Sequence, residues 1–353
     1  MDASRLSSHL LSLMQCPAFS VQNGIIEYAN PAATQLQVQV GDSIEDLLHT
    51  GEEAYRAFQG GCLFLTVCIA TVIRGASVTR IEGLDIFQIE QDSDNQHLKA
   101  YALAAQNLRN PLSNLIAVSQ QLFSPEELQT DSDKQHKSAQ LNRGLSQMQR
   151  LVGNMSDAML YSTAKMPMET IDVSALFRET MEKCATLLEK AGIALEYSEP
   201  NEEIRCLANA NRLERAVYNM VSNGAKFSDG GTLQAKLTKN KGFLAFTLQG
   251  IGSAGTTAMP ADAFYRFLRE PGLSDSQQGI GLGMYLIRSA AISHGGTLLL
   301  EQPENQGMRM TITIPIRRKS GTLHAQVLRV DAWGGRDGGL IELSDILPSE
   351  AFE

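Results

Sequence analysis

The sequence predicts an α+β multidomain chain: a small α/β sheet domain, an antiparallel two-helix hairpin, an α/β-sandwich domain and a short tail. Three observations predict this organisation. Residues 1–92 contain β-branched strands around an Asn-Gly turn, residues 93–165 carry a heptad repeat of apolar residues, and residues 166–318 alternate amphipathic helices with strands. The length of 353 residues suits two or three domains.

The composition is that of an ordinary globular protein. Apolar residues make up 43% and charged residues 20%, which excludes wholesale disorder. The net charge of −9 argues against sequence-independent binding of nucleic acid, which needs a basic surface. The five cysteines are an odd number without a CxxC pair, so we expect no disulfide framework and no zinc ribbon, but a reducing cytoplasm.

The longest apolar stretch, from Cys62 to Ile73, has about a dozen residues, whereas a membrane-spanning helix needs about 20. Its β-branched content predicts one or two buried strands instead. The N-terminus lacks the basic flank and apolar core of a signal peptide. We therefore expect a soluble, cytoplasmic protein with no membrane span.

The N-terminal block, residues 1–92, opens with a short amphipathic helix. Strands over Ala18–Val21 and Ile25–Ala29 flank Asn23-Gly24, and Asn-Gly is a strong hairpin signal because both residues tolerate a positive φ. The rest of the block is expected to form a short helix over Ile44–His49 and strands within Leu63–Arg74 and Ser77–Glu90.

Residues 93–165 are expected to form a helical hairpin whose turn begins at Ser124-Pro125. Apolar residues mark one face of each helix: Ala105, Leu108, Leu112, Leu115 and Leu122 in the first, and Leu141, Leu145, Met148, Val152, Met155 and Met159 in the second. Two helices with such a seam bury little alone, so we expect a four-helix homodimer, although a packing face within the chain would give the same pattern.

In residues 166–318 the expected helices cover Val173–Ala191, Asn211–Phe227 and Gly283–His294, and the expected strands cover Ala194–Tyr197, Phe243–Leu248, Leu298–Glu301 and Met308–Ile316. The tail, residues 319–353, has a hairpin-like pattern in which Ala325–Val330 and Leu340–Leu343 flank paired glycines. This tail could dock a partner or pack back on its own domain.

Two patterns in the third block point to phosphate chemistry. Asn219 and Asn223 are four residues apart on one predicted helix face, and Lys226 follows three residues later. Amide oxygens can ligate Mg²⁺ and a lysine can neutralise phosphate oxygens, although the same residues can form a solvated helix face. Further on, Gly279–Gly283 holds three alternating glycines where a helix begins, and backbone N–H groups there can approach a phosphate closely.

Taken in order, these patterns resemble the ATP-binding domain of sensor histidine kinases, which is shared with gyrase, the Hsp90 chaperone and MutL. Asn211–Ser228 resembles the asparagine box, Phe264–Phe267 the phenylalanine motif of the ATP lid, and Gly279–Gly283 the second glycine box. The resemblance covers residues 95–316 and implies that ATP and Mg²⁺ are bound. It implies these nucleotide-binding residues: Asn223 on the metal, Asn219 and Lys226 near the phosphates, and Gly250, Gly252, Gly279, Gly281 and Gly283 in the two glycine boxes.

The N-terminal block resembles a PAS sensory domain, through Pro17–Val21 and Asn23–Ala33. No sensory ligand follows from this likeness. A PAS-like domain (1–92), a dimerisation hairpin (93–165) and an ATP-binding domain (166–318) in this order imply a two-component signalling protein. The partners implied are a second copy of the chain and a response regulator or partner kinase.

The chain departs from the family at the adenine contact. The family's first glycine box reads DxGxG, and here Leu248 stands at the aspartate position ahead of Gly250 and Gly252. In the family that carboxylate accepts a hydrogen bond from the adenine amino group. Leucine cannot accept it, and the loss of such a partner costs about 1–3 kcal/mol.

The chain also departs at the phosphoacceptor. The family motif H-E-x-R-x-P-L corresponds to Gln106–Leu112, in which Arg109 and Pro111 are in place. Gln106 stands at the histidine position, and an amide is not a usable nucleophile for phosphoryl transfer. Asn107 stands at the position of the base and cannot accept the proton.

Two classes of function follow. One is an active ATP-dependent histidine kinase that phosphorylates a response regulator. The other is a degenerate kinase with no intact catalytic residue, which acts as a dimeric scaffold or a nucleotide-gated switch, and the three departures favour it. His97 and His136 lack the acceptor motif and are expected on the surface, and His294 is expected to be structural.

Overall fold

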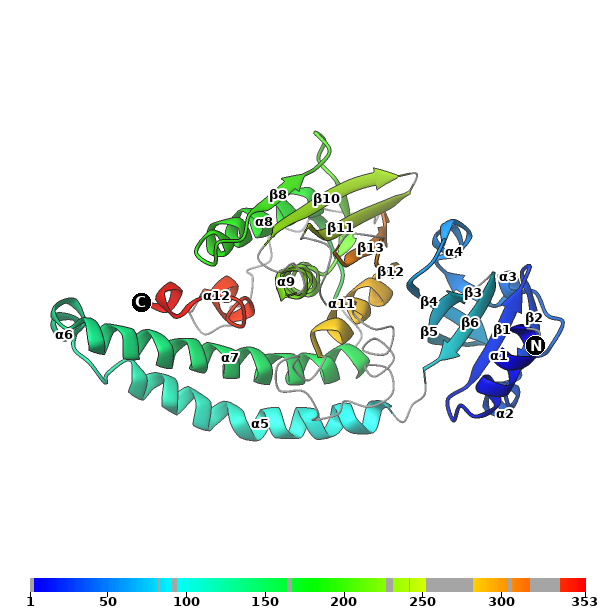
Figure 1. Cartoon of the computed structure of the whole chain (residues 1–353), viewed down its shortest axis with the longest axis horizontal. Helices are drawn as coiled ribbons and strands as arrows, with labels where there is room; N and C mark the ends of the chain where they lie inside the picture. Colours follow the sequence, from blue (N-terminus) through cyan, green and yellow to red (C-terminus); the bar gives the residue numbers. More distant parts are fainter. Residues whose placement is uncertain are drawn as a thin grey trace.

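The computed structural model describes residues 3–81, 83–90, 94–163, 167–226, 231–240, 242–251, 282–303, 307–317 and 337–353. A sheet domain, a long helical hairpin and an α/β domain follow one another, and the C-terminal segment lies between the hairpin and the α/β domain (Figure 1). The predicted α+β class is confirmed. No helix in these ranges is both long enough and apolar enough to cross a bilayer.

The N-terminal domain is an antiparallel sheet with the strand order β2-β1-β6-β5-β4 and short flanking helices. Its elements are α1 (Ala3–Ser12), β1 (Ala18–Gln22), β2 (Ile25–Ala29), α2 (Pro31–Gln35), α3 (Ile44–Leu47), β3 (Leu48–Thr50), α4 (Glu52–Ala57), β4 (Cys62–Ile69), β5 (Val72–Ile81) and β6 (Leu84–Ile89). Asn23 and Gly24 make the predicted turn, with φ of 51° and 80°. The helix predicted over Ile44–His49 ends early because Leu48–Thr50 pair with β4.

Aromatic rings and one polar cluster fill the interior of this sheet. Phe19 and Phe87 stack with their ring centroids 4.9 Å apart. Beside them Tyr55 Oη donates to Asp85 Oδ2 at 2.6 Å, and Arg80 Nη2 donates to the same oxygen at 2.8 Å. The buried carboxylate therefore has its own donors, which makes its burial tolerable.

The hairpin consists of α5 (Asp94–Ser119), α6 (Pro125–Thr130) and α7 (Ser132–Thr163). The predicted turn contains α6, which begins with a capping box in which Ser124 Oγ accepts from the Glu127 N–H. In the predicted seam Met159 is partly buried, Leu122 lies beyond the end of α5, and the residues other than Met159 divide into two sets. Buried within the chain are Ala105, Leu112, Leu145, Val152 and Met155. Between 40% and 52% exposed are Leu108, Leu115, Leu122, Leu141 and Met148.

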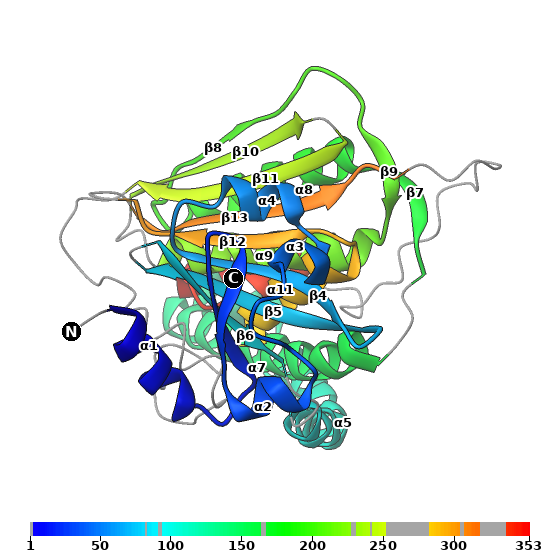
Figure 2. The ribbon, with the colours of Figure 1, turned by 90° about the vertical axis from the view of Figure 1, so that its right-hand side faces the viewer.

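The α/β domain is built from a sheet with the strand order β12-β13-β11-β10-β8, and its helices α8, α9 and α11 cover one face of this sheet (Figure 2). Its elements are β7 (Glu169–Asp172), α8 (Val173–Glu189), β8 (Leu195–Ser198), β9 (Arg205–Ala208), α9 (Ala210–Lys226), β10 (Thr232–Asn240), β11 (Phe243–Ile251), α11 (Leu282–Ser293), β12 (Thr297–Glu301) and β13 (Arg309–Pro315). The predicted helices and strands are present. The sequence pattern missed β10 and the separate two-stranded sheet of β7 and β9.

The two sheets join into one eleven-stranded sheet, because β4 pairs antiparallel with β12 (Figure 2). Leu298 lies opposite Phe64, and the side chains of Phe64 and Cys62 are part of the hydrophobic core of the α/β domain. Gly61, directly before β4, has a φ of 91°. A Cβ at Gly61 would collide with the carbonyl oxygen of Leu300.

The described part of the tail is helical. The strand predicted over Leu340–Leu343 is wrong, because these residues lie in and directly after α12 (Gly338–Glu342), and a 3₁₀ turn follows over Ser349–Phe352. Asp337 starts α12 by accepting from the Gly339 N–H at 2.8 Å. Leu343, Leu347 and Phe352 then pack into the core of the α/β domain, so the tail packs back on the chain. The other predicted strand, Ala325–Val330, lies outside the described residues.

Candidate functional site

The helix α9 carries the predicted phosphate-binding side chains. Asn209 caps its start, since Asn209 Oδ1 accepts from the Arg212 N–H at 3.0 Å. The predicted apolar seam is buried in the domain core: Leu213, Val217, Met220 and Val221. Because this seam faces the sheet, the polar residues of α9 face α7 and α11.

Asn219 lies in the interior. It is 0% exposed; its Nδ2 donates to the Arg215 carbonyl oxygen at 2.8 Å, and its Oδ1 accepts from Arg150 Nη2 at 3.4 Å. Gly283, near the start of α11, packs against it, because a Cβ there would lie 2.7 Å from Asn219 Oδ1. The arrangement explains why glycine is needed at position 283, and the predicted place of Asn219 near phosphates remains a prediction.

Asn223 and Lys226 are more accessible. Asn223 is half-buried, and its carboxamide makes no hydrogen bond to another residue of the described part of the chain. The side chain of Lys226 is 26% exposed, and its Nζ donates to Asp345 Oδ2 of the tail at 2.7 Å. Among the described residues the Asn223 amide thus has no hydrogen-bond partner, and Lys226 follows it three positions later on α9, a combination that fits a metal and phosphate site.

The first glycine box lies at the end of a strand. Gly250 is part of β11, and its N–H donates to the Met308 carbonyl oxygen at 3.3 Å. Leu248 is fully buried in the core beside Gly224, where a Cβ would lie 2.8 Å from Leu248 Cδ2. Such an apolar side chain does not fit the adenine amino group. The remaining predicted residues, Gly252, Phe264–Phe267, Gly279 and Gly281, lie outside the described residues.

A buried polar interface joins α7 to α9, and sequence reasoning missed it. Arg215 Nη2 donates to Asn154 Oδ1 at 2.8 Å, and Arg215 forms an ion pair with Asp157. One turn away, Arg150 Nη2 donates to Ser222 Oγ at 3.1 Å. The sequence did contain a signal for this interface. Arg150, Asn154 and Asp157 are spaced four and three residues apart, which places them on one face of α7, opposite its apolar seam.

The tail completes this interface with two carboxylates. Glu342 is 0% exposed and lies 3.1 Å from Arg215 Nε and 3.5 Å from Arg150 Nε. Burial raises the pKa of Glu342, although both guanidinium groups oppose this. Asp345 reaches Arg150 Nη1 at 2.5 Å as well as Lys226. The tail therefore ties the hairpin to the α/β domain at the asparagine-bearing helix (Figure 1).

The residues at the phosphoacceptor position are exposed on α5. Gln106 and Asn107 directly follow the buried Ala105, and both lie at the surface. Arg109 Nη2 donates to Ser156 Oγ of α7 at 3.3 Å. The amide of Gln106 therefore stands in solvent on the helix that faces α7, and its chemistry remains that of a carboxamide.

Two other histidines can be placed. His294 is 3% exposed; its Nε2 accepts from the Asn209 N–H at 3.0 Å, and its Nδ1 lies 2.7 Å from the Ala290 carbonyl oxygen, to which it donates. Burial lowers the pKa of His294 to about 4. This ring holds α11 to the cap of α9, which confirms the structural role. His136 is exposed, and its Nδ1 lies 4.0 Å from Glu350.

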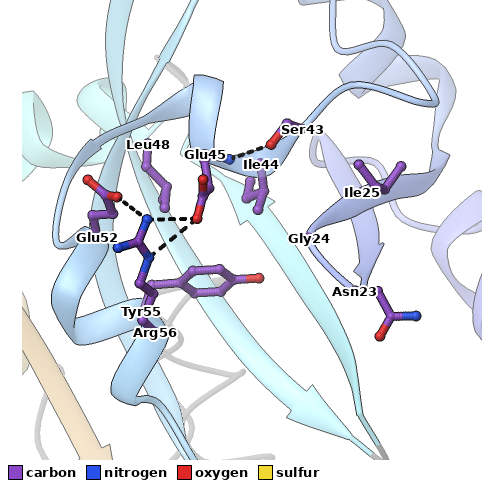
Figure 3. Close-up of a pocket in the computed structure, with 10 residues that line it drawn as sticks. All are labelled: Asn23, Gly24, Ile25, Ser43, Ile44, Glu45, Leu48, Glu52, Tyr55 and Arg56. Atoms are coloured by element: carbon purple, nitrogen blue, oxygen red, sulfur yellow. Dashed lines mark hydrogen bonds and ion pairs between the residues drawn. The ribbon is translucent and has the colours of Figure 1, made fainter.

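A separate pocket of about 310 Å³ opens on the N-terminal domain (Figure 3). Its lining residues are Asn23, Gly24, Ile25, Ser43, Ile44, Glu45, Leu48, Glu52, Tyr55 and Arg56. The cation of this lining, Arg56, pairs with Glu45 at 2.9 Å and with Glu52 at 2.6 Å. The charge of Arg56 is thus already balanced by carboxylates that line the same pocket. The pocket shares no residue with the α9 site.

Comparison with known proteins agrees with this geometry. Residues 208–318, which include α9, α11 and the strands from β10 to β13, match the family described as histidine kinase-, DNA gyrase B- and HSP90-like ATPase. Sporulation kinase B of Bacillus subtilis (strain 168) is 27% identical over 221 residues, which cover 61% of this chain and 48% of that protein. Sensor histidine kinase RppB of Synechocystis sp. is 26% identical over 262 residues, which cover 72% of this chain and 56% of that protein.

Among solved structures, full-length ShkA in complex with AMPPNP aligns over 63% of this chain and 47% of its own, with 17% identity and a TM-score of 0.49. The chain spans about half the length of the two relatives above. The domain that bears α9 is an ATPase domain of the class shared by histidine kinases, gyrase B and HSP90. Over longer stretches of 221 and 262 residues, the chain is similar to the histidine kinases named above.

Proposed function

We propose that this chain is a degenerate histidine kinase of a two-component system. It acts as a dimeric signalling scaffold or nucleotide-gated switch and does not phosphorylate itself. The observation that carries the proposal is Gln106, which occupies the exposed acceptor position of α5 with Asn107 beside it. Neither amide can act as a nucleophile or accept a proton at neutral pH. The hairpin therefore lacks an acceptor group at this position.

For the nucleotide, we expect different outcomes at the phosphates and at the base. Asn223 would ligate Mg²⁺, and Lys226 would neutralise phosphate oxygens, because both side chains remain within reach of solvent. When bound, MgATP would supply a triphosphate whose charge these residues hold. Leu248, buried beside Gly224, offers the adenine no acceptor. We therefore expect ATP to bind with weakened recognition of its base.

The proposed homodimer forms through the hairpin. Leu108 and Leu115 lie seven residues apart on α5, and Leu122 follows three residues beyond its end; they are 43%, 52% and 52% exposed, so the chain itself does not cover them. Such a heptad stripe packs well against its symmetric copy. In this proposal the PAS-like N-terminal domain changes the conformation of the hairpin, and a response regulator or a partner kinase binds according to that conformation.

Calorimetry on the full chain tests the nucleotide part of this function. MgATP at millimolar concentration is titrated into the wild type and into Asn223→Ala, with adenosine as a ligand without phosphate. Binding of ATP that Asn223→Ala abolishes, with no binding of adenosine, supports the switch. If neither protein binds ATP, the nucleotide switch is excluded and the scaffold remains.

The other candidate, an active autokinase, would need a different acceptor. The exposed His136 sits at the far end of α7, in the first turns after Ser132, and carries no acceptor motif. Transfer of labelled phosphate to a histidine would establish this candidate and overturn the degenerate one.

A further inference from the structure

An anion from the tail already occupies the basic groups at the end of α9. Asp345 Oδ2 accepts from Lys226 Nζ at 2.7 Å and from Arg150 Nη1 at 2.5 Å. One carboxylate oxygen thus bridges a lysine of α9 and an arginine of α7. Arg150 and Lys226 lower the pKa of Asp345, although its burial opposes this, so the group is an anion at neutral pH.

We call this pair of cations, Arg150 and Lys226, the anion seat. Contacts outside the tail also hold Arg150 in place. Arg150 is 7% exposed in its side chain, and its Nη2 donates to Ser222 Oγ at 3.1 Å and to Asn219 Oδ1 at 3.4 Å. Its guanidinium is therefore held against the asparagine-bearing helix independently of Asp345. Asn223 lies one residue after Ser222 on the same helix.

We propose that Arg150 and Lys226 form a phosphate-binding seat, and that the Asp345 carboxylate and a phosphate group of a nucleotide are its alternative occupants. A guanidinium and an ammonium group bind carboxylate and phosphate oxygens through the same charge-assisted hydrogen bonds, so the two anions compete directly. This inference rests on the proposed nucleotide-binding function. It adds Arg150, a residue of the hairpin, to the phosphate ligands and makes the tail a built-in competitor of the nucleotide.

The exchange requires only a local movement. Leu343, Leu347 and Phe352 anchor the tail in the domain core on both sides of Asp345. The carboxylate can therefore leave the seat while these anchors remain in place. A phosphate that displaces Asp345 would break the ion pair between Arg150 of α7 and the tail. Binding at the anion seat would therefore change how the hairpin is held by the tail.

The test uses inorganic tripolyphosphate, which has no base and so does not depend on the adenine pocket. Isothermal titration compares the wild-type chain with Asp345→Asn, which keeps the shape of the side chain but removes its charge. We expect Asp345→Asn to bind tripolyphosphate at least tenfold more tightly than the wild type. The double variant Asp345→Asn with Arg150→Gln should lose this gain.

Glu350→Gln is the matched control, because it removes the same charge from the same tail at a side chain that is 61% exposed and whose charged neighbour is His136. Its affinity should equal that of the wild type. Asp345→Ser is a second variant should the amide disturb folding, which circular dichroism monitors. Equal affinities of the wild type and both Asp345 variants, or no binding by any of them, overturn the proposal.

The same titrations with MgATP separate this inference from the proposed function. Tighter tripolyphosphate binding by Asp345→Asn without any ATP binding would support the seat and refute nucleotide binding. ATP binding that depends on Asn223, together with unchanged tripolyphosphate affinity in Asp345→Asn, would refute the seat and leave the proposed function intact.

Discussion

Replacement of Gly61 by alanine should separate the two sheets. Gly61 has a φ of 91°, at which a side chain costs about 1–2 kcal/mol. Its Cβ would also collide with the Leu300 carbonyl oxygen, so β4 cannot keep its place beside β12. The two strands pair at three residue positions, and each hydrogen bond is worth about 0.5–1.5 kcal/mol net. We expect Gly61→Ala to destabilise this junction by about 2–4 kcal/mol.

Hydrogen exchange of the β12 amides that face β4 measures this effect. A loss of 2 kcal/mol corresponds to exchange that is faster by about 30-fold. Gly60→Ala is the control, because nothing lies within 4 Å of its added Cβ and its φ is not positive. The reasoning is refuted if Gly61→Ala exchanges at the wild-type rate, or if Gly60→Ala has the same effect.

Three further predictions concern other parts of the chain. Because the pKa of His294 falls from its ordinary 6.5 to about 4 in the fold, only the unfolded chain takes up this proton between those values. Stability in urea should therefore fall by about 3 kcal/mol as the pH drops from 6.5 to 4, and His294→Gln should lack this component; an unchanged pH profile in the variant would contradict the assignment. Leu115→Glu should give a monomer in sedimentation, while Leu13→Glu, at a side chain that is 68% exposed outside the hairpin, should leave the dimer intact; a dimeric Leu115→Glu protein would refute the hairpin interface. Gly283→Ala should destabilise the fold by about 1–3 kcal/mol by pressing on Asn219, whereas Gly144→Ala in open space within α7 should stabilise it by about 0.5–1 kcal/mol, both measured by thermal unfolding; a stabilising Gly283→Ala would contradict the packing.

Local signals carried most of the fold prediction. The Asn23–Gly24 turn, the helices α5, α7 and α9 and the strand β11 all follow from side-chain spacing and from backbone preferences, which act within a few residues. β10 was missed although Leu233, Ala235 and Leu237 alternate inward, because the polar residues between and after them (Gln234, Lys236 and Thr238–Asn240) resemble a polar loop.

The long-range features were not predictable from spacing. The pairing of β4 with β12 joins segments more than 200 residues apart, and nothing local specifies which strand edge meets which. The tail was predicted as a hairpin from its paired glycines, but Asp337 caps a helix there, and Leu343 and Leu347 share one buried face.

The candidate site was predicted in part for the same reason. Asn223 and Lys226 lie on α9 as expected, because a helix fixes their relative positions. The contacts of Lys226 and Arg150 with Asp345 connect distant parts of the chain. From the sequence alone, many other acidic residues could equally well have been their partner. The burial of Asn219 likewise depends on how α7 and α11 pack against α9.

The measurement that tests the proposed function most directly is transfer of labelled phosphate from ATP. The full chain is incubated with γ-labelled ATP and Mg²⁺, and alkali-stable phosphate on the protein is quantified, since phosphohistidine survives alkali and is lost in acid. The double variant Gln106→His with Asn107→Glu, which restores both groups of the acceptor motif, is carried in parallel. The degenerate-kinase proposal predicts no alkali-stable label on the wild-type chain. Such label on a wild-type histidine would contradict it and establish an active kinase with a different acceptor.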